Sequence, residues 1–328
     1  MEIQKIFFET TKQRLNPNLR LVDVISDLLN IGSDSAYRRL RGEKELTLSE
    51  LVKLSAYFNI SIDSLLNYKS DNVIFKYTPL DFTDMQDYTS YIRSLSNLYE
   101  GLAKAKRKEI LITAQDIPIF HFTPFVELTF FKLYAWNQSI NRNQISYDQF
   151  VSGLDRDELS LIYDKIINSY SQIPSTEIWS ENTIEPILRL FDYHLDMDCF
   201  ESKQYPVLLC HQLLQLIENV ELWAEKGCKE HNGDVAYFQM YLSSVDMENN
   251  FVITKRDDVT TTSVKLFTIN GIFTSNDAFC EETERWIRSL ISKSLYLSGS
   301  SDRERFRFFQ QIKNKINDLL EKFERKKK

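Results

Sequence analysis

Residues 21–66 constrain the fold most strongly, because they read as four short helices separated by small polar turns. Over residues 21–29 the apolar side chains recur at the helical spacing. Asn30-Ile31-Gly32 interrupts this pattern, and Gly32 suits a tight turn. A second helix is expected over about residues 34–41, where few side chains are apolar, so its three arginines should mostly point outward.

The flanking residues complete a helical domain. Thr47-Leu48-Ser49-Glu50 has the form of a capping box and predicts the start of a third helix. Ser61 is expected to cap a fourth, short helix, and residues 3–15 form one more amphipathic helix upstream. Residues 1–70 therefore predict an all-α, five-helix helix-turn-helix domain. In such a motif the second helix enters the major groove of DNA while the first lies against the backbone.

The candidate DNA-binding residues lie on and beside the helix over residues 34–41. Arg38 or Arg39 is expected to pair with guanine, because an arginine can donate two hydrogen bonds to that base. Arg20 and Lys44 are expected to contact phosphate, and Asp34 could read cytosine instead. The complete predicted set is Arg20, Ser33, Asp34, Ser35, Tyr37, Arg38, Arg39, Arg41 and Lys44.

Residues 33–66 carry a resemblance to a known family through the run SDSAYRRLRGEKELTLSELVKLSAYFNISIDSLL. This run resembles the Cro/repressor-type (XRE-type) helix-turn-helix domain, in versions common in large Bacteroidetes regulators. The family's closing stretch is matched by Leu51, Leu54, Phe58, Ile60, Ile62, Asp63 and Leu65. Ala36 departs from the pattern, since the family has a large apolar residue there, and Tyr37 and Leu40 are expected to do that packing. The resemblance covers residues 1–70 only, and it implies a DNA-binding transcriptional regulator.

Charge and composition limit the classes of protein to which the chain can belong. A chain of 328 residues suggests two domains. The net charge is −7, but residues 1–70 hold ten Lys/Arg and nine Asp/Glu, a balance of +1 that leaves −8 for the rest. Weak non-specific DNA binding and a need for dimers are expected consequences. The sequence has no apolar run of membrane-spanning length, no signal-peptide core and no paired cysteine spacing, so we expect a cytoplasmic protein with reduced thiols and no membrane partner.

The rest of the chain predicts a connecting segment and a larger domain. Residues 71–108 are expected to form a linker followed by a long connecting helix. Residues 109–328 predict an α+β domain for effector binding or assembly, mostly helical, with an early strand over residues 109–115 and antiparallel strands late. Asn270-Gly271 is the strongest hairpin signal, because both residues tolerate the positive φ of a type I′ turn.

Chemical motifs are scarce. The aromatic-rich residues 125–136 predict either a ligand pocket or a helix buried on most faces, and His121 either lines a pocket or packs in the core. Cys210-His211 with Cys228 and His231 could be combined into a zinc set, but the first pair is adjacent on a helix, so its side chains diverge. We expect no metal, no cofactor and no enzymatic activity, because no catalytic constellation is present.

These observations favour a sequence-specific, homodimeric DNA-binding transcriptional regulator whose C-terminal domain binds an unidentified small-molecule or protein effector. The main alternative is a scaffold protein that uses the helix-turn-helix to bind another protein; an enzyme with a DNA-binding domain is a third. Near the C-terminus, five apolar residues follow a narrow helical seam that suits either a dimer contact or docking on the same chain: Phe309, Ile312, Ile316, Leu319 and Phe323.

Overall fold

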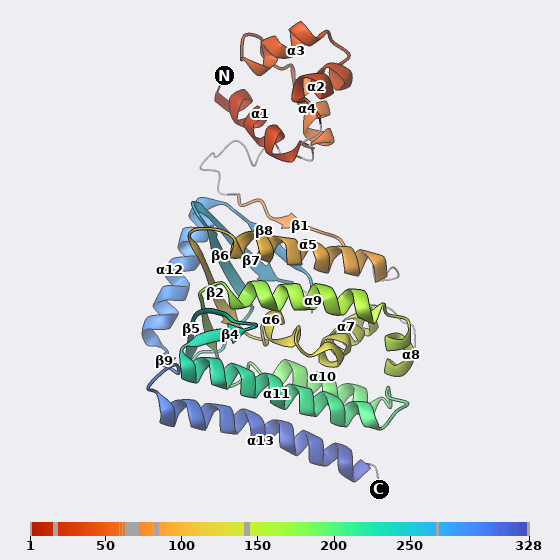
Figure 1. Cartoon of the computed structure of the whole chain (residues 1–328), viewed down its shortest axis with the longest axis vertical. Helices are drawn as coiled ribbons and strands as arrows, with labels where there is room; N and C mark the ends of the chain where they lie inside the picture. The colour runs from red at the N-terminus through yellow and green to blue at the C-terminus, as the bar shows by residue number, and fades with distance from the viewer. Residues whose placement is uncertain are drawn as a thin grey trace. The chain divides into compact units, whose positions relative to one another are not determined.

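The computed structural model describes residues 2–15, 19–58, 60, 62, 72–81, 85–140, 145–266 and 269–326. The chain divides into two compact units, residues 1–74 and residues 75–328 (Figure 1). Each unit has its own hydrophobic core.

The described residues of the first unit form four short helices. They are α1 (Glu2–Arg14), α2 (Leu21–Leu29), α3 (Ser33–Leu40) and α4 (Leu48–Tyr57). Their shared core is closed by apolar residues from every helix and from the segment after α4, among them Phe7, Ile25, Ala36, Leu54 and Ile60. The fifth helix expected from Ser61 onward lies outside the described residues.

A three-residue connection joins α2 to α3. Asn30 takes the left-handed conformation that ends α2, with φ of 52°, and the Ile31 N–H donates to the Ser26 carbonyl oxygen at 3.0 Å. Asparagine tolerates this conformation better than most residues. Gly32 is extended, with φ of −64°, so the turn depends on Asn30 rather than on the glycine.

Arg39 and Glu50 tie α3 to the start of α4. The Arg39 guanidinium donates to both carboxylate oxygens of Glu50, at 2.6 and 3.2 Å, and to the Ser35 carbonyl oxygen at 3.1 Å. Glu50 also completes the predicted capping box, accepting from the Thr47 N–H at 3.0 Å while Thr47 Oγ1 accepts from the Glu50 N–H at 3.2 Å. One carboxylate thus caps α4 and neutralises a buried cation.

The second unit combines helices with one mixed sheet. Its elements are β1 (Lys76–Tyr77), α5 (Met85–Ala103), β2 (Lys108–Ala114), α6 (Ile119–Phe122), α7 (Val126–Ile140), α8 (Tyr147–Ser152), α9 (Arg156–Ser171), β3 (Ser175–Trp179), α10 (Glu185–Asp196), α11 (Gln204–Lys226), β4 (Cys228–His231), β5 (Asp234–Leu242), β6 (Phe251–Arg256), β7 (Val259–Lys265), β8 (Gly271–Thr274), α12 (Asp277–Lys293), β9 (Leu295–Tyr296) and α13 (Asp302–Lys326).

The sheet order is β1-β8-β7-β6-β2-β3-β5-β4, with β9 paired to β5. The centre, β2-β3-β5, is parallel, and the other described pairs are antiparallel. The predicted early strand is β2, and the predicted late antiparallel strands are present in β6-β7-β8. They belong to one mixed sheet with a parallel centre, which was not predicted. α12 lies on one side of the sheet and α9 and α11 lie on the other (Figure 1). Alternate residues of β2 face opposite ways: Leu111 packs with Ile287 of α12, and Ile110 and Ile112 pack into the main core.

The predicted turn at Asn270-Gly271 is wrong. Lys265 pairs with Gly271, and the Leu266 N–H donates to the Asn270 carbonyl oxygen at 3.0 Å. Gly271 is thus the first residue of β8, and Asn270 directly precedes the strand. Gly271 is instead needed for close packing, because a Cβ there would lie 2.8 Å from the Val264 carbonyl oxygen.

The structure shows what two of the expected helices, α5 and α13, pack against. α5, expected in the connecting segment, buries Tyr88, Ile92 and Tyr99 in the main core of the second unit. α13 runs along α11 (Figure 1), and its apolar seam is 0–6% exposed within the single chain. Of the two uses expected for the seam, the structure shows docking on the same chain, so these side chains are not available for a dimer contact.

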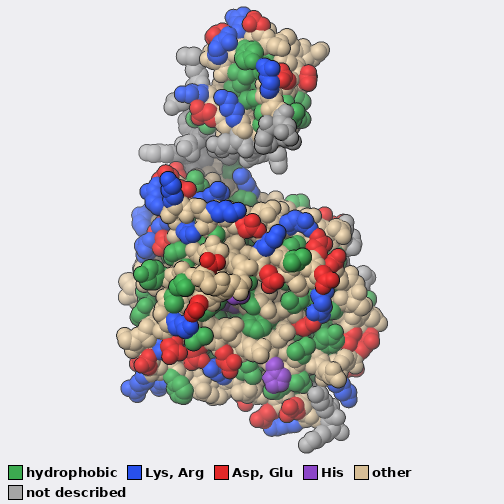
Figure 2. All heavy atoms as spheres, in the orientation of Figure 1, with side chains coloured by type: hydrophobic (Ala, Val, Ile, Leu, Met, Phe, Trp, Pro, Cys, Tyr) green, Lys and Arg blue, Asp and Glu red, His purple; other side chains and the backbone are tan. Residues whose placement is uncertain are grey.

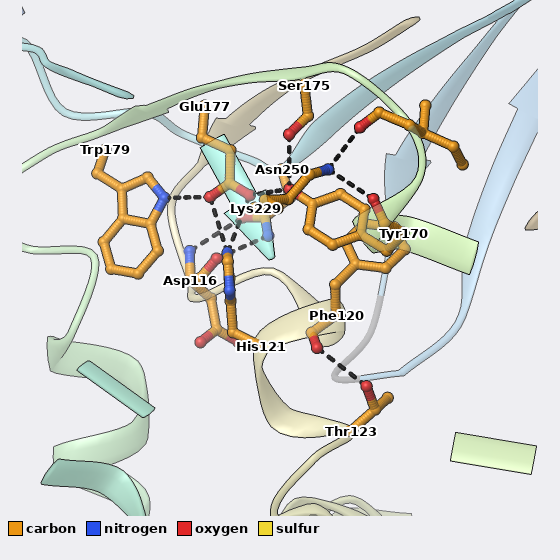
Figure 3. Close-up of polar contacts among 11 residues, drawn as sticks. Asp116, Phe120, His121, Thr123, Tyr170, Ser175, Glu177, Trp179, Lys229 and Asn250 are labelled. Carbon is orange, nitrogen blue, oxygen red and sulfur yellow. Dashed lines mark hydrogen bonds and ion pairs between the residues drawn. The ribbon is translucent and has the colours of Figure 1, made fainter. Parts of the chain in front are cut away.

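A buried polar cluster lies at the centre of the second unit (Figure 3). The Glu177 carboxylate accepts from Trp179 Nε1 at 2.7 Å and from the Tyr170 hydroxyl, and His121 Nε2 lies 2.9 and 3.0 Å from its two oxygens. Burial by itself would raise the pKa of Glu177, but attraction to His121 and these hydrogen bonds lower it. His121 is thus a core histidine with a partner.

The division into two units predicts where a protease acts first. β1 is paired with β8, which protects the chain from Lys76 onward, whereas α4 and the core to Ile60 belong to the first unit. Limited proteolysis of the full chain should cut first between residues 62 and 76, yielding two folded fragments that mass spectrometry can identify. First cleavage within α2, α3 or α4 would show that residues 1–74 are not a stable unit.

The Arg39–Glu50 pair predicts a specific pattern of stability losses. Glu50→Gln keeps a capping residue but leaves the buried Arg39 charge unpaired, so it should lower the free energy of unfolding of the first unit by about 3 kcal/mol. The Arg39→Met, Glu50→Gln double variant should recover part of that loss, and denaturant melts of the four proteins give the coupling. Additive losses would contradict a coupled pair.

The same pair predicts a loss of stability in acid. The hydrogen bond from Arg39 lowers the pKa of Glu50 below its ordinary value of 4.5. A carboxyl group with a lowered folded-state pKa stabilises the fold above its unfolded pKa and stops doing so as pH falls through the folded value. The stability gap between the native protein and Arg39→Met should therefore shrink below about pH 4.5.

Candidate nucleic-acid interface

α3 presents a polar face to solvent because only one side of this short helix is anchored. Ala36 and Arg39 are buried and Leu40 packs against the core of the first unit. The remaining side chains point outward to different extents: Ser33, Asp34, Tyr37 and Arg38 are exposed, and Ser35 is half-buried. Arg41, directly after the helix, is also exposed.

Arg39 does not belong to the exposed face, contrary to the prediction that it could read guanine. Its side chain is 4% exposed and its donors are engaged by Glu50 and Ser35. The physical reason is helical spacing: Arg39 lies three residues after Ala36, on the side that faces the core. Arg38, one position earlier, is 54% exposed and remains able to reach a ligand.

The small Ala36 is accommodated differently from what was expected. Ala36 is fully buried, and Leu40 packs beside it, but Tyr37 is 39% exposed and adds little to the core. The Tyr37 hydroxyl instead accepts from Arg20 Nη2 at 3.0 Å, which links the start of α2 to α3. Arg20 also lies 3.6 Å from Asp23, so its guanidinium interacts with both a hydroxyl and a carboxylate.

Glu43 faces two of the predicted DNA-binding arginines. Arg41 donates to both of its carboxylate oxygens, at 2.5 and 3.1 Å, and Arg38 lies 3.8 Å away. The hydrogen bond from Arg41 lowers the pKa of Glu43, which keeps this carboxylate charged. Glu43 therefore competes with any phosphate or base that these two arginines bind.

The loop after α3 is held by Gln4 of α1, which no sequence signal had marked. Its amide nitrogen donates to the carbonyl oxygens of Arg39 and Lys44 at 2.8 and 2.9 Å, and its amide oxygen accepts from the Leu46 N–H at 2.9 Å. This clamp fixes the backbone that carries Arg41 and Lys44. A long-range contact of this kind, spanning 35–42 residues, cannot be read from local spacing.

Four of the predicted cations, Arg20, Arg38, Arg41 and Lys44, are therefore exposed on or beside α3, and Glu43 lies close to two of them. Figure 2 shows, on one face of this unit, lysine and arginine side chains next to acidic ones. Positive groups beside a protruding polar helix suit contact with phosphate, although the acidic neighbours reduce the local charge.

The thiols and histidines considered for zinc are not assembled. Within the described residues, no group of three or more His, Cys, Asp or Glu side chains is arranged to hold a metal ion. Cys210 is buried in the core, which raises the pKa of its thiol to about 12. Across the same residues, no helix combines the length and the apolar character needed to cross a bilayer.

A comparison with known protein families gave a match in the N-terminal part of the chain. Residues 11–96 match the family model of the BetR domain. Neither curated proteins nor solved structures gave a match. The resemblance to the Cro/repressor-type family that the sequence suggested is therefore wrong: the matching family is a different one, and its domain extends past α4 into α5. A BetR domain favours a regulatory role for this region.

Proposed function

We propose that the protein is a sequence-specific DNA-binding transcriptional regulator, with α3 as its recognition element. The observation that carries the proposal is the exposure of Arg38 on a short helix, with Arg20, Arg41 and Lys44 around it. The three-residue connection between α2 and α3 has the length found in helix-turn-helix motifs. The match to a BetR domain over residues 11–96 supports a regulatory role.

The side chains suggest different roles in the complex. Arg38 lies along the exposed face of α3 and is the candidate for a bidentate contact with guanine. Arg41 and Lys44 stand on the loop that Gln4 fixes, and Arg20 stands at the start of α2, so these three are candidates for phosphate contacts. Base contacts would set the sequence preference, and phosphate contacts would set the register.

A dimer is part of the proposal. One recognition helix reads only a few base pairs, so two copies on half-sites about 34–36 Å apart would be needed to specify an address. Because the α13 seam is used within the chain, the pairing surface must lie elsewhere. Sedimentation of the protein on its selected DNA gives the stoichiometry, and one chain per site would exclude this arrangement.

Selection from random duplex DNA tests the proposed function directly. The full-length protein should retain a defined motif, and Arg38→Ala should lower affinity for it by about 1–3 kcal/mol while relaxing one base position. Lys44→Ala should weaken binding to all sequences alike. Lys53→Ala on α4 is a matched control, because Lys53 is exposed but lies outside the proposed contact set. Failure to enrich any motif would count against sequence-specific binding.

Removing the acidic partner should have the opposite effect. Glu43→Gln frees Arg41 and Arg38 from a competing carboxylate, so affinity for both specific and random DNA should increase. Fluorescence anisotropy at fixed salt measures the change. Unchanged affinity for Glu43→Gln, with wild-type stability, would mean that these arginines do not meet DNA.

Salt dependence separates DNA binding from the scaffold alternative. If Arg20, Arg38, Arg41 and Lys44 each neutralise one phosphate, the logarithm of affinity should fall with the logarithm of salt concentration with a slope of about −3 to −4 per bound unit. A slope near zero would favour the use of this surface for binding another protein.

A further inference from the structure

The second unit contains a large cavity between α5 and one face of the sheet. Its volume is about 640 Å³, within the range typical of small-molecule sites. One wall is the inner face of α5, with Tyr91, Leu95 and Leu98, and the floor includes Phe120 of α6. All the lining residues belong to the second unit, and most are apolar.

The cavity is elongated along the strands. Alternate residues of β6 and the position before it line it, from Asn250 through Val252 and Thr254 to Arg256. From the first to the last of these positions are six residue steps, or about 20 Å at the rise of an extended strand. The lining residues of α5 run from Asp87 to Leu102, which is about 22 Å of helix. A site of this length suits a linear ligand better than a compact one.

One end of the cavity carries a cationic group built around the buried Asp116. Lys132 of α7 and Lys265 of β7 both donate to Asp116 Oδ2, at 2.7 and 2.6 Å. Asn250 holds the backbone of Asp116 through two hydrogen bonds, of 2.9 and 2.8 Å (Figure 3). Both lysines and Asn250 line the cavity, whereas Asp116 lies behind them.

This group carries one carboxylate for two ammonium ions. Lys132 is 8% exposed, and burial lowers its pKa to about 8. Each ammonium has three donors, and Asp116 is the single hydrogen-bond acceptor recorded for either one among the described residues. Lys132 also lies over the Phe122 ring, 4.3 Å from its centroid. A second anion in the cavity would balance the remaining positive charge and would accept hydrogen bonds from the other donors of the two ammonium groups.

The cationic end is the less exposed end of the cavity. Asn250, Ile117 and Lys132 are buried there, and Lys265 is 26% exposed. At the other end, near Arg256, Leu98 and Val259 are 46% and 57% exposed. A ligand that enters through this more exposed end must place its charged group first and leave its tail along the apolar wall.

We propose that the cavity binds a linear amphipathic carboxylic acid, with the carboxylate on Lys132 and Lys265 and the hydrocarbon chain between α5 and β6. This site is independent of the proposed DNA surface, since it rests on residues of the second unit alone. It would make that unit a sensor for acyl-chain acids.

Calorimetric titration of the full-length, delipidated protein tests the site. Probes are octanoate, decanoate, dodecanoate and hexadecanoate, with dodecanol as the uncharged comparison. Affinity should rise about fourfold for each added methylene that is buried. Dodecanoate should bind more tightly than dodecanol, because the alcohol cannot balance the lysine charge.

Variants locate the ligand. Lys265→Met should weaken dodecanoate binding at least about tenfold, the effect of losing a charged hydrogen bond, and should leave dodecanol unaffected. Lys255→Met is the matched control, because Lys255 lies on neighbouring β6 but pairs with Glu284 of α12 on the other face of the sheet. Thr254→Phe, which fills the middle of the cavity, should end the gain in affinity at a shorter chain.

Three results would overturn the proposal: no binding of any probe, equal affinity for dodecanoate and dodecanol, or equal losses in Lys265→Met and Lys255→Met. Thermal melts establish that each variant is folded. If Lys265→Met does not fold, the chain-length cutoff in Thr254→Phe decides the question by itself.

Discussion

The buried carboxylate of Glu177 is the constraint on which the second unit depends. It lies on β3, a strand whose residues are buried throughout, so its charge is withdrawn from water. Such a charge is tolerated only when donors surround it, and here they come from separate elements: His121 from α6, Tyr170 from α9 and Trp179 from β3 itself. Satisfying one carboxylate thus fixes a helix, a strand and a short turn relative to one another.

The cluster also sets the floor of the cavity. α6 is a single turn in which His121 points to Glu177 while Phe120 and Phe122 line the cavity. Phe120 stacks on Tyr170, with ring centroids 4.2 Å apart and planes within 6°. The polar network on one side of α6 therefore positions the aromatic surface on the other.

The first unit uses the same principle on a smaller scale. Arg39 is withdrawn from solvent, and Glu50 both neutralises it and caps α4. The pairing orients α3 so that Arg38 remains outside. Arg38 and Arg39 are adjacent and chemically identical. Arg39 is the structural one because it meets Glu50, which lies 11 residues further along the sequence.

Local patterns could be predicted from the sequence, and long-range ones could not. The capping box at Thr47 and Glu50 formed as expected, because all of its atoms lie within one turn. β3 was missed because burial on both faces removes the alternation that marks a strand, and Glu177 made it look polar. The α13 seam had the right period for pairing, but the period does not say whether the partner is α11 or a second chain.

The existence of the cavity follows from the arrangement of layers. The centre of the sheet, β2-β3-β5, is covered by several helices on its main-core face, but over β6, β7 and β8 the cavity's helical wall is α5. Strands lie about 4.8 Å apart, so the four from β2 to β8 span about 14 Å, while a helix with its side chains is about 10 Å wide. One helix cannot close that width by itself. The space left beneath α5 runs along the strands, which accounts for an elongated cavity.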